Sequence, residues 1–191
     1  MKITGILLAA GSGSRFGGGK LLHGLADGTP IGVASLRNLR AALPEVLAVV
    51  RSGDDALRML LESEGIAVQI CADAHAGMAR SLMCGIEASR DADGWVIALG
   101  DMPFLLPRTI ESIAARVAQT GRIAVPACRG ERGHPVGFGN RYLDALLELE
   151  GDEGARSVIR RHPRDVEIVD CDDRGILRDI DTPADLEKPA G

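Results

Sequence analysis

The sequence predicts an α/β fold, a three-layer sandwich in which helices cover both faces of a mostly parallel sheet. Apolar runs typical of buried parallel strands alternate with segments of helical periodicity along the chain. Hydrophobic residues make up 46% of the sequence but aromatic residues only 3%, which indicates an aliphatic core. No repeat or linker divides the 191 residues, so we expect a single domain over residues 1–191.

The first half of the chain alternates strands and helices. Thr29 stands before Pro30 as an expected N-cap, and Pro44 ends the helix that follows. A second helix is amphipathic and ends at Gly65. The expected elements are a strand at 6–10, a helix at 31–43, a strand at 46–50, a helix at 54–64 and a strand at 66–71.

The second half continues the pattern. One of its helices begins at Pro107 and ends before Gly121. Near the C-terminus, Thr182 and Asp185 predict a helix start close to a capping box. The expected elements are a helix at 77–89, a strand at 95–99, a helix at 107–120, a strand at 123–126, a polar turn at 129–135 that returns into a strand at 136–138, helices at 143–149 and 155–161, and a strand at 166–169.

Charge and cysteine content exclude several classes of protein. The formal net charge of −5 argues against a nucleic-acid partner held by bulk electrostatics. The four cysteines are scattered and form no CxxC pair, so neither a zinc site nor a disulfide framework is expected. We find no signal peptide and no apolar run of about 20 residues. We therefore expect a cytoplasmic protein without a membrane partner.

A glycine-rich loop follows the first predicted strand. Residues 11–20 contain five glycines, two serines and the cations Arg15 and Lys20. Glycine lets backbone N–H groups converge on an anion, and the two cations supply charge. The loop therefore indicates a phosphate-binding site, with a solvated loop as the alternative.

Two better-known phosphate loops do not match. A Walker A loop needs glycine where Ser14 stands and a serine or threonine where Leu21 stands. A dinucleotide fingerprint that starts at Gly11 needs a third glycine at the position of Phe16.

Other polar residues follow the later strands, where ligands bind in α/β folds. Ser81 lies in the start of a helix after Gly77, Asp101 follows the strand at 95–99, and His134 precedes a short strand. Each has a plainer interpretation: a solvated serine, an aspartate that caps a turn, and a surface histidine.

The acidic residues near the C-terminus form a further candidate site. Asp179 and Asp181 alternate around Ile180, so we expect them on the same face of a short strand.

Taken in order, these motifs resemble the MobA-like nucleotidyltransferases, whose fold is glycosyltransferase-A-like, and within them the molybdenum cofactor cytidylyltransferases. The motifs are Leu8-Ala9-Ala10-Gly11, Gly13 to Gly17 with Arg15, Lys20, Gly77 with Ser81, Gly100-Asp101-Met102-Pro103, Gly133-His134-Pro135, Gly151 to Arg156, and Asp179 to Pro183.

The resemblance implies transfer of CMP from CTP to the phosphate of molybdopterin or its molybdenum-bearing form, with release of pyrophosphate. It implies Arg15, Lys20 and Asp101 as catalytic residues, and Asp101 and Asp181 as ligands of Mg²⁺ or Mn²⁺, with Asp181 favoured over Asp179. His134 is the expected acceptor-binding residue, and a molybdoenzyme or its chaperone is an expected protein partner. The implied nucleotide-binding residues are Leu8, Ala9, Ala10, Gly11, Gly13, Lys20, Gly77, Ser81 and Asp101.

Two alternatives stay open. The first is a related nucleotidyltransferase that uses GTP or another phosphorylated acceptor. The second is a non-catalytic nucleotide-binding regulator or chaperone, which would need the glycine loop but not both aspartates.

Overall fold

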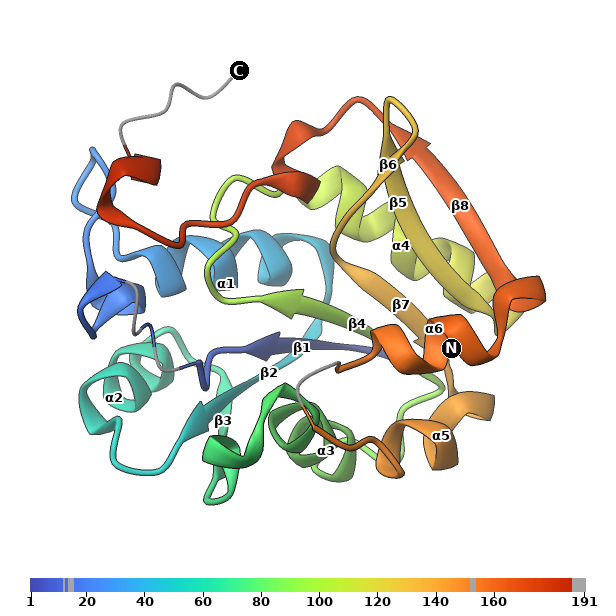
Figure 1. Cartoon of the computed structure of the whole chain (residues 1–191), viewed down its shortest axis with the longest axis horizontal. Helices are drawn as coiled ribbons and strands as arrows, with labels where there is room; N and C mark the ends of the chain where they lie inside the picture. The colour runs from blue at the N-terminus through green and yellow to red at the C-terminus, as the bar shows by residue number, and fades with distance from the viewer. Residues whose placement is uncertain (12, 14–15, 152–153, 187–191) are drawn as a thin grey trace.

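A computed structural model describes residues 1–11, 13, 16–151 and 154–186. It confirms the α/β fold with a mostly parallel sheet, in the order β3-β2-β1-β4-β7-β5-β6, with β8 also paired to β5 (Figure 1). Strands β3, β2, β1 and β4 are parallel neighbours, and β8 is parallel to β5. Strand β7 runs antiparallel between β4 and β5. The strands are β1 (Ile3–Leu8), β2 (Glu45–Arg51), β3 (Ala67–Cys71), β4 (Gly94–Leu99), β5 (Ile123–Cys128), β6 (Glu131–Arg132), β7 (Val136–Gly139) and β8 (Val166–Cys171).

Helices cover both faces of the sheet, as Figure 1 shows. Their buried side chains divide into two clusters: α1, α2 and α4 contribute to one, and α3, α5 and α6 to the other. The α-helices are α1 (Ile31–Ala42), α2 (Asp55–Ser63), α3 (Met78–Glu87), α4 (Pro107–Thr120), α5 (Leu143–Leu147) and α6 (Arg156–Arg161). The 3-10 helices are η2 (Lys20–Leu22), η3 (Ala74–Ala76), η4 (Asn140–Tyr142), η5 (Pro163–Asp165), η6 (Arg174–Leu177) and η7 (Pro183–Leu186).

The central strands are apolar because they are buried on both faces. Ile6 and Leu7 are adjacent in β1, yet Ile6 packs in the cluster of α3 and Leu7 in the cluster of α1. This alternation follows from the two-residue period of a strand. A strand with helices on both sides therefore reads as an uninterrupted apolar run rather than an alternating one. Among the described residues, no helix combines the length and apolarity that crossing a bilayer requires.

Several local predictions were wrong. The first strand, predicted at 6–10, is β1 over Ile3–Leu8. Thr29 does not cap α1, because Pro30 occupies the N-cap position. The Thr29 N–H donates instead to the Asp27 carboxylate at 2.9 Å. Helix α5 ends at Leu147, two residues before the predicted end. The segment around Ile180 forms no strand: it contacts the loop after β4, where the Ile180 N–H donates to the Asp101 carbonyl at 2.9 Å.

Candidate active site

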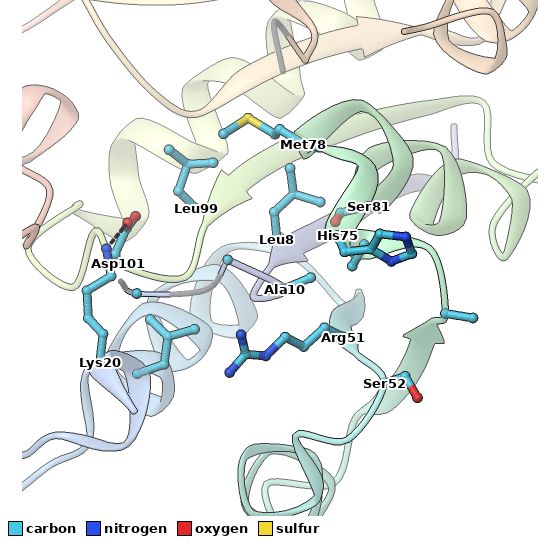
Figure 2. Close-up of a pocket in the computed structure, with 16 residues that line it drawn as sticks. Leu8, Ala10, Lys20, Arg51, Ser52, His75, Met78, Ser81, Leu99 and Asp101 are labelled. Carbon is cyan, nitrogen blue, oxygen red and sulfur yellow. Dashed lines mark hydrogen bonds and ion pairs between the residues drawn. The ribbon is translucent and has the colours of Figure 1, made fainter. Parts of the chain in front are cut away.

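A cavity of about 490 Å³ opens at the carboxyl ends of the four parallel strands β1 to β4. This is the edge at which α/β sheets bind ligands, because the loops there diverge from neighbouring strands. Figure 2 shows the side chains around it. Its lining residues are Leu8, Ala10, Gly11, Gly13, Lys20, Leu21, Arg51, Ser52, Ala72, Ala74, His75, Gly77, Met78, Ser81, Leu99 and Asp101.

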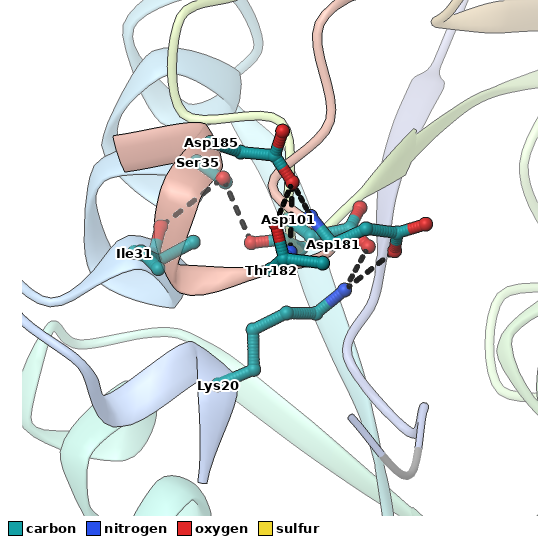
Figure 3. A network of polar contacts seen from close by, with 8 residues as sticks. Lys20, Ile31, Ser35, Asp101, Asp181, Thr182 and Asp185 are labelled. Atoms are coloured by element: carbon teal, nitrogen blue, oxygen red, sulfur yellow. Dashed lines mark hydrogen bonds and ion pairs between the residues drawn. The ribbon is translucent and has the colours of Figure 1, made fainter. Parts of the chain in front are cut away.

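Lys20 connects two acidic residues that are far apart in the sequence (Figure 3). Its Nζ lies 2.7 Å from Asp101 Oδ2 and 3.4 Å from Asp181 Oδ1. The Lys20 side chain is only 12% exposed, so this ion pairing is shielded from solvent more than a surface pair would be. One ammonium group therefore pairs with two carboxylates and offsets only one of their two charges.

Backbone contacts from three elements hold Asp101 at the end of β4. The N–H of Gly100 donates to the carbonyl of Leu8 at 2.9 Å, and the Gly100 carbonyl accepts from the Ser35 hydroxyl at 2.9 Å. Ser35 is a buried residue of α1, so a helix as well as the sheet fixes this position. Ile180 N donates to the Asp101 carbonyl, which joins the loop to the C-terminal segment.

Asp185 holds Asp181 in place. Its Oδ2 accepts from the backbone N–H groups of Asp181 and Thr182 at 3.1 and 2.8 Å, and from the Thr182 hydroxyl at 2.9 Å. The predicted capping role of Asp185 is thus confirmed, although the helix it starts is the 3-10 helix η7. Asp181 is half-buried and faces Lys20, whereas Asp179 is exposed.

Asp101 and Asp181 fit a hard divalent cation. Asp101 Oδ1 is buried and has no hydrogen-bond donor among the described residues, so one carboxylate oxygen still lacks a partner. The described part of the chain contains no group of three or more side chains able to hold a metal. Two carboxylates suit Mg²⁺ or Mn²⁺ in a phosphate site, where phosphates and waters complete the shell.

Most of the residues predicted to bind nucleotide line this cavity, namely Leu8, Ala10, Gly11, Gly13, Lys20, Gly77, Ser81 and Asp101. Ala9 is the exception: its side chain packs in the core, and its N–H donates to the Val49 carbonyl. Ala9 follows the last residue of β1 but keeps the alternation of the strand, since Leu7, two residues earlier, lies in the same buried cluster. Arg15 lies outside the described residues.

His134 does not line the cavity. Its backbone N–H donates to the Ile176 carbonyl at 2.9 Å. Burial lowers the pKa of His134 below its ordinary value of 6.5; the positive charge of Arg156 lowers it further, and the negative charge of Asp101 opposes the shift. His134 is therefore a neutral imidazole at pH 7, within electrostatic range of Asp101.

This lowered pKa predicts a contribution to acid lability. Between the folded-state pKa and 6.5 the unfolded chain binds more protons at this residue, so the free energy of unfolding falls as the pH falls below 6.5. We expect His134→Gln to flatten this part of the profile, measured by urea unfolding between pH 5 and about 8. A variant whose profile stays parallel to the unmodified protein would contradict the shift.

Sequence reasoning missed several lining residues, above all Arg51, Ser52 and His75. Arg51 and Ser52 come directly after the strand predicted at 46–50, so the rule that ligands bind at carboxyl ends could have found them. The Arg51 side chain is oriented by Asp54, with Nε and Oδ2 3.5 Å apart. His75 lies in η3, a short element that no periodicity predicts.

Two relatives are similar in sequence to this chain over most of its length. The chain is 30% identical over 189 residues to the nicotine blue oxidoreductase of Paenarthrobacter nicotinovorans, covering 94% of this chain and 92% of that one. It is 32% identical over 150 residues to a probable molybdenum cofactor guanylyltransferase of Thermococcus gammatolerans, covering 77% of this chain and 73% of that one.

The structure is similar to that of Rv0371c from Mycobacterium tuberculosis H37Rv, with a TM-score of 0.82, 30% identity, and coverage of 98% of this chain and 96% of that one. A manganese complex of Rv0371c matches with a TM-score of 0.76 and 26% identity, over 90% of this chain and 88% of that one. Residues 5–166 match the family described as MobA-like NTP transferase domain. That match spans the glycine-rich loop, Lys20 and Asp101, and the chain therefore belongs to this family of nucleotidyltransferases.

Proposed function

We propose that this nucleotidyltransferase transfers CMP from CTP to the phosphate of molybdopterin or its molybdenum-bearing form, and releases pyrophosphate. The observation that carries the proposal is the cluster of Lys20, Asp101 and Asp181 beside a glycine-rich loop. Cationic side chains and backbone N–H donors stabilise the negative charge of a triphosphate. The transfer also requires that the phosphates be held in one orientation relative to the acceptor. The choice of molybdopterin rests on the motif resemblance, and the guanylyltransferase relative supports it.

The reaction needs no covalent enzyme intermediate. An acceptor phosphate oxygen attacks the α-phosphorus, the bond from that phosphorus to the oxygen of the β-phosphate breaks, and pyrophosphate leaves with the electron pair. The protein then acts by orientation and charge stabilisation. Lys20 turns from the carboxylates toward the leaving pyrophosphate. The N–H groups of the glycine-rich loop bind the triphosphate of the nucleotide. Arg15 is assigned the same task by its motif.

Asp101 and Asp181 would hold a divalent cation, Mg²⁺ or Mn²⁺, through Asp101 Oδ1 and an oxygen of Asp181. When bound, such an ion neutralises charge on the nucleotide phosphates. Asp185 keeps the backbone of Asp181 in register, and Ser35 does the same for the residue before Asp101.

Ser81 and Ala10 lie on the walls that would contact the nucleoside. Ser81 is 5% exposed and lines the cavity, so its hydroxyl can bond the base or the sugar. Ala10 carries a methyl group where the related guanylyl-transferring branch has glycine. That methyl leaves less room beside the base and favours a pyrimidine over a purine.

We therefore expect CTP to lead over GTP and ATP in kcat/KM. One misplaced methyl group is worth about 1–3 kcal/mol, so the preference is on the order of ten- to a hundredfold. Ala10→Gly should gain on GTP while its activity with CTP changes little. The measurement compares the three nucleotides with one acceptor in both proteins. GTP or ATP leading in the unmodified protein would contradict the assignment.

The reaction itself is tested by following pyrophosphate release from CTP with and without molybdopterin. Release only with molybdopterin supports the proposal. Release with a sugar phosphate or another phosphorylated acceptor instead identifies a different transferase. Nucleotide binding without release under any condition identifies a regulator or chaperone.

The relative described as an oxidoreductase supplies one more comparison. The same preparation is incubated with nicotine blue and a chemical reductant, and the absorbance of the dye is followed against a control without protein. Protein-dependent reduction of the dye in the absence of pyrophosphate release would replace the transferase assignment with an oxidoreductase. The absence of reduction alongside release would support the transferase.

A further inference from the structure

Asp173 is a buried carboxylate with no part in the proposed chemistry. Its side chain is only 2% exposed, and among the described residues no other acidic side chain is buried in the core. It accepts three hydrogen bonds: from the N–H of Leu106 at 2.9 Å, the hydroxyl of Thr109 at 2.7 Å and the N–H of Gly175 at 2.8 Å. A buried charge with three donors is costly to rearrange, which indicates a specific position.

Two of these donors belong to the segments that carry the acidic residues of the site, and the third belongs to the helix that follows one of them. Leu106 ends the loop over 101–106, which begins at Asp101, and Thr109 lies in the first turn of α4. Gly175 lies in the segment over 173–181, which ends at Asp181 and is called the strap below. Asp173 lies at the start of the strap and binds the end of the loop, whereas Asp181 ends the strap and Asp101 begins the loop.

Further contacts continue from Asp173 toward the site. A Cβ on Gly175 would collide with the Phe104 carbonyl, so only glycine lets the strap approach the loop here. The Arg178 guanidinium lies over the Phe104 ring, 3.7 Å from its centroid. The Ile180 N–H donates to the Asp101 carbonyl at 2.9 Å. The strap and the loop thus run side by side from Asp173 to the two carboxylates.

We propose that Asp173 is a positioning residue for the cation site: it sets the register of the strap against the loop, and so the separation of Asp181 from Asp101. The inference rests on the proposed function, in which those two carboxylates hold the metal. Asp173 does not touch the ion or the nucleotide; it acts through the backbone that carries both ligands.

A carboxylate is needed at this position because all three neighbours are donors. Both oxygens of an ionised aspartate accept, and the start of α4 favours a negative charge. An asparagine has the same shape, but its NH₂ group donates and would face at least one of these donors. Asp173→Asn should therefore shift the strap while leaving the volume of the core unchanged.

The test is a titration of the whole protein with Mn²⁺, read by electron paramagnetic resonance without nucleotide. Changes to groups that support metal ligands commonly cost about ten- to a hundredfold in metal affinity, and we expect about tenfold for Asp173→Asn. Metal-free CTP affinity should stay unchanged, and kcat should recover at saturating Mn²⁺. Thr109→Val removes one donor and should weaken Mn²⁺ binding by a smaller factor; it also tests the proposal if Asp173→Asn does not fold.

Ser89→Ala is the matched control. Ser89 is also buried and accepts from Trp95 Nε1 at 3.0 Å, but Trp95 belongs to the buried cluster that does not include the strap residues Ile176 and Ile180. It should lower the thermal midpoint without changing Mn²⁺ affinity. Unchanged Mn²⁺ affinity in Asp173→Asn, or an equal loss in Ser89→Ala, would overturn the proposal. Failure of the proposed function looks different: the unmodified protein would bind Mn²⁺ but release no pyrophosphate.

Discussion

Replacing Lys20 with methionine is expected to lower turnover about a hundredfold while the nucleotide-free protein binds Mn²⁺ more tightly. Loss of one preorganised charge contact to a developing anion raises the activation free energy by about 3 kcal/mol, which corresponds to about a hundredfold lower rate. The gain in metal affinity has a separate cause. In the nucleotide-free protein the ammonium group lies against Asp101 and Asp181, where it competes with a cation for both carboxylates. Steady-state rates and an electron paramagnetic resonance titration measure the two effects.

Lys2→Met is the control for this experiment. Lys2 pairs with Asp91 at 2.6 Å on the exposed surface, so the same substitution removes an ion pair that has no contact with the site. It should leave turnover and Mn²⁺ binding unchanged. Full activity in Lys20→Met would show that Lys20 has only a structural role, and weaker Mn²⁺ binding would contradict the competition.

Asp101→Asn should abolish most of the activity and most of the metal dependence together. Asparagine keeps the shape and the turn-capping ability of aspartate but removes the charge that a divalent cation needs. Charge stabilisation of several kcal/mol corresponds to a loss on the order of a thousandfold in kcat. The measurement is kcat as a function of Mg²⁺ and Mn²⁺ concentration, with thermal unfolding to verify the fold.

The two aspartates around Ile180 give this experiment an internal comparison. Asp181→Asn should reproduce the phenotype of Asp101→Asn, because Asp181 faces the same ammonium group. Asp179→Asn should behave as the unmodified protein, because Asp179 is exposed. A near-normal Asp101→Asn enzyme would mean that Asp101 merely caps its turn, and an inactive Asp179→Asn enzyme would reverse the choice of ligand.

Local patterns predict much of this fold because each depends on a few neighbouring residues. The boundaries of α4 follow from Pro107 and Gly121, and the structure places them at the predicted residues. The strand before the glycine loop was predictable because it is apolar on both faces. The predicted helix boundaries were less accurate where such signals are weak or absent, as at the start of α1 near Thr29 and at the end of α5.

Much of the candidate site was also present in the sequence. Asp101 follows a buried strand, and Lys20 follows a glycine loop after another. Neighbouring parallel strands present their carboxyl ends at one edge, so these two residues had to lie near each other. Ser81 reached the cavity for the same reason, on the helix that follows β3. Ala9 did not, because the alternation of β1 continues one residue past its end and places the Ala9 side chain in the core.

Sequence alone determined the fold class, the edge of the sheet at which the cavity lies and the residues at the ends of β1 and β4, because these depend on local periodicity and strand polarity. Tertiary structure decided the contacts that cross from one segment to another. The choice of Asp181 over Asp179 depends on the backbone turn that Asp185 stabilises, and the pairing of Lys20 with both carboxylates depends on how the strap docks against the loop after β4. Such docking is set by long-range hydrogen bonds and packing, including those of Asp173, which no spacing along the chain encodes.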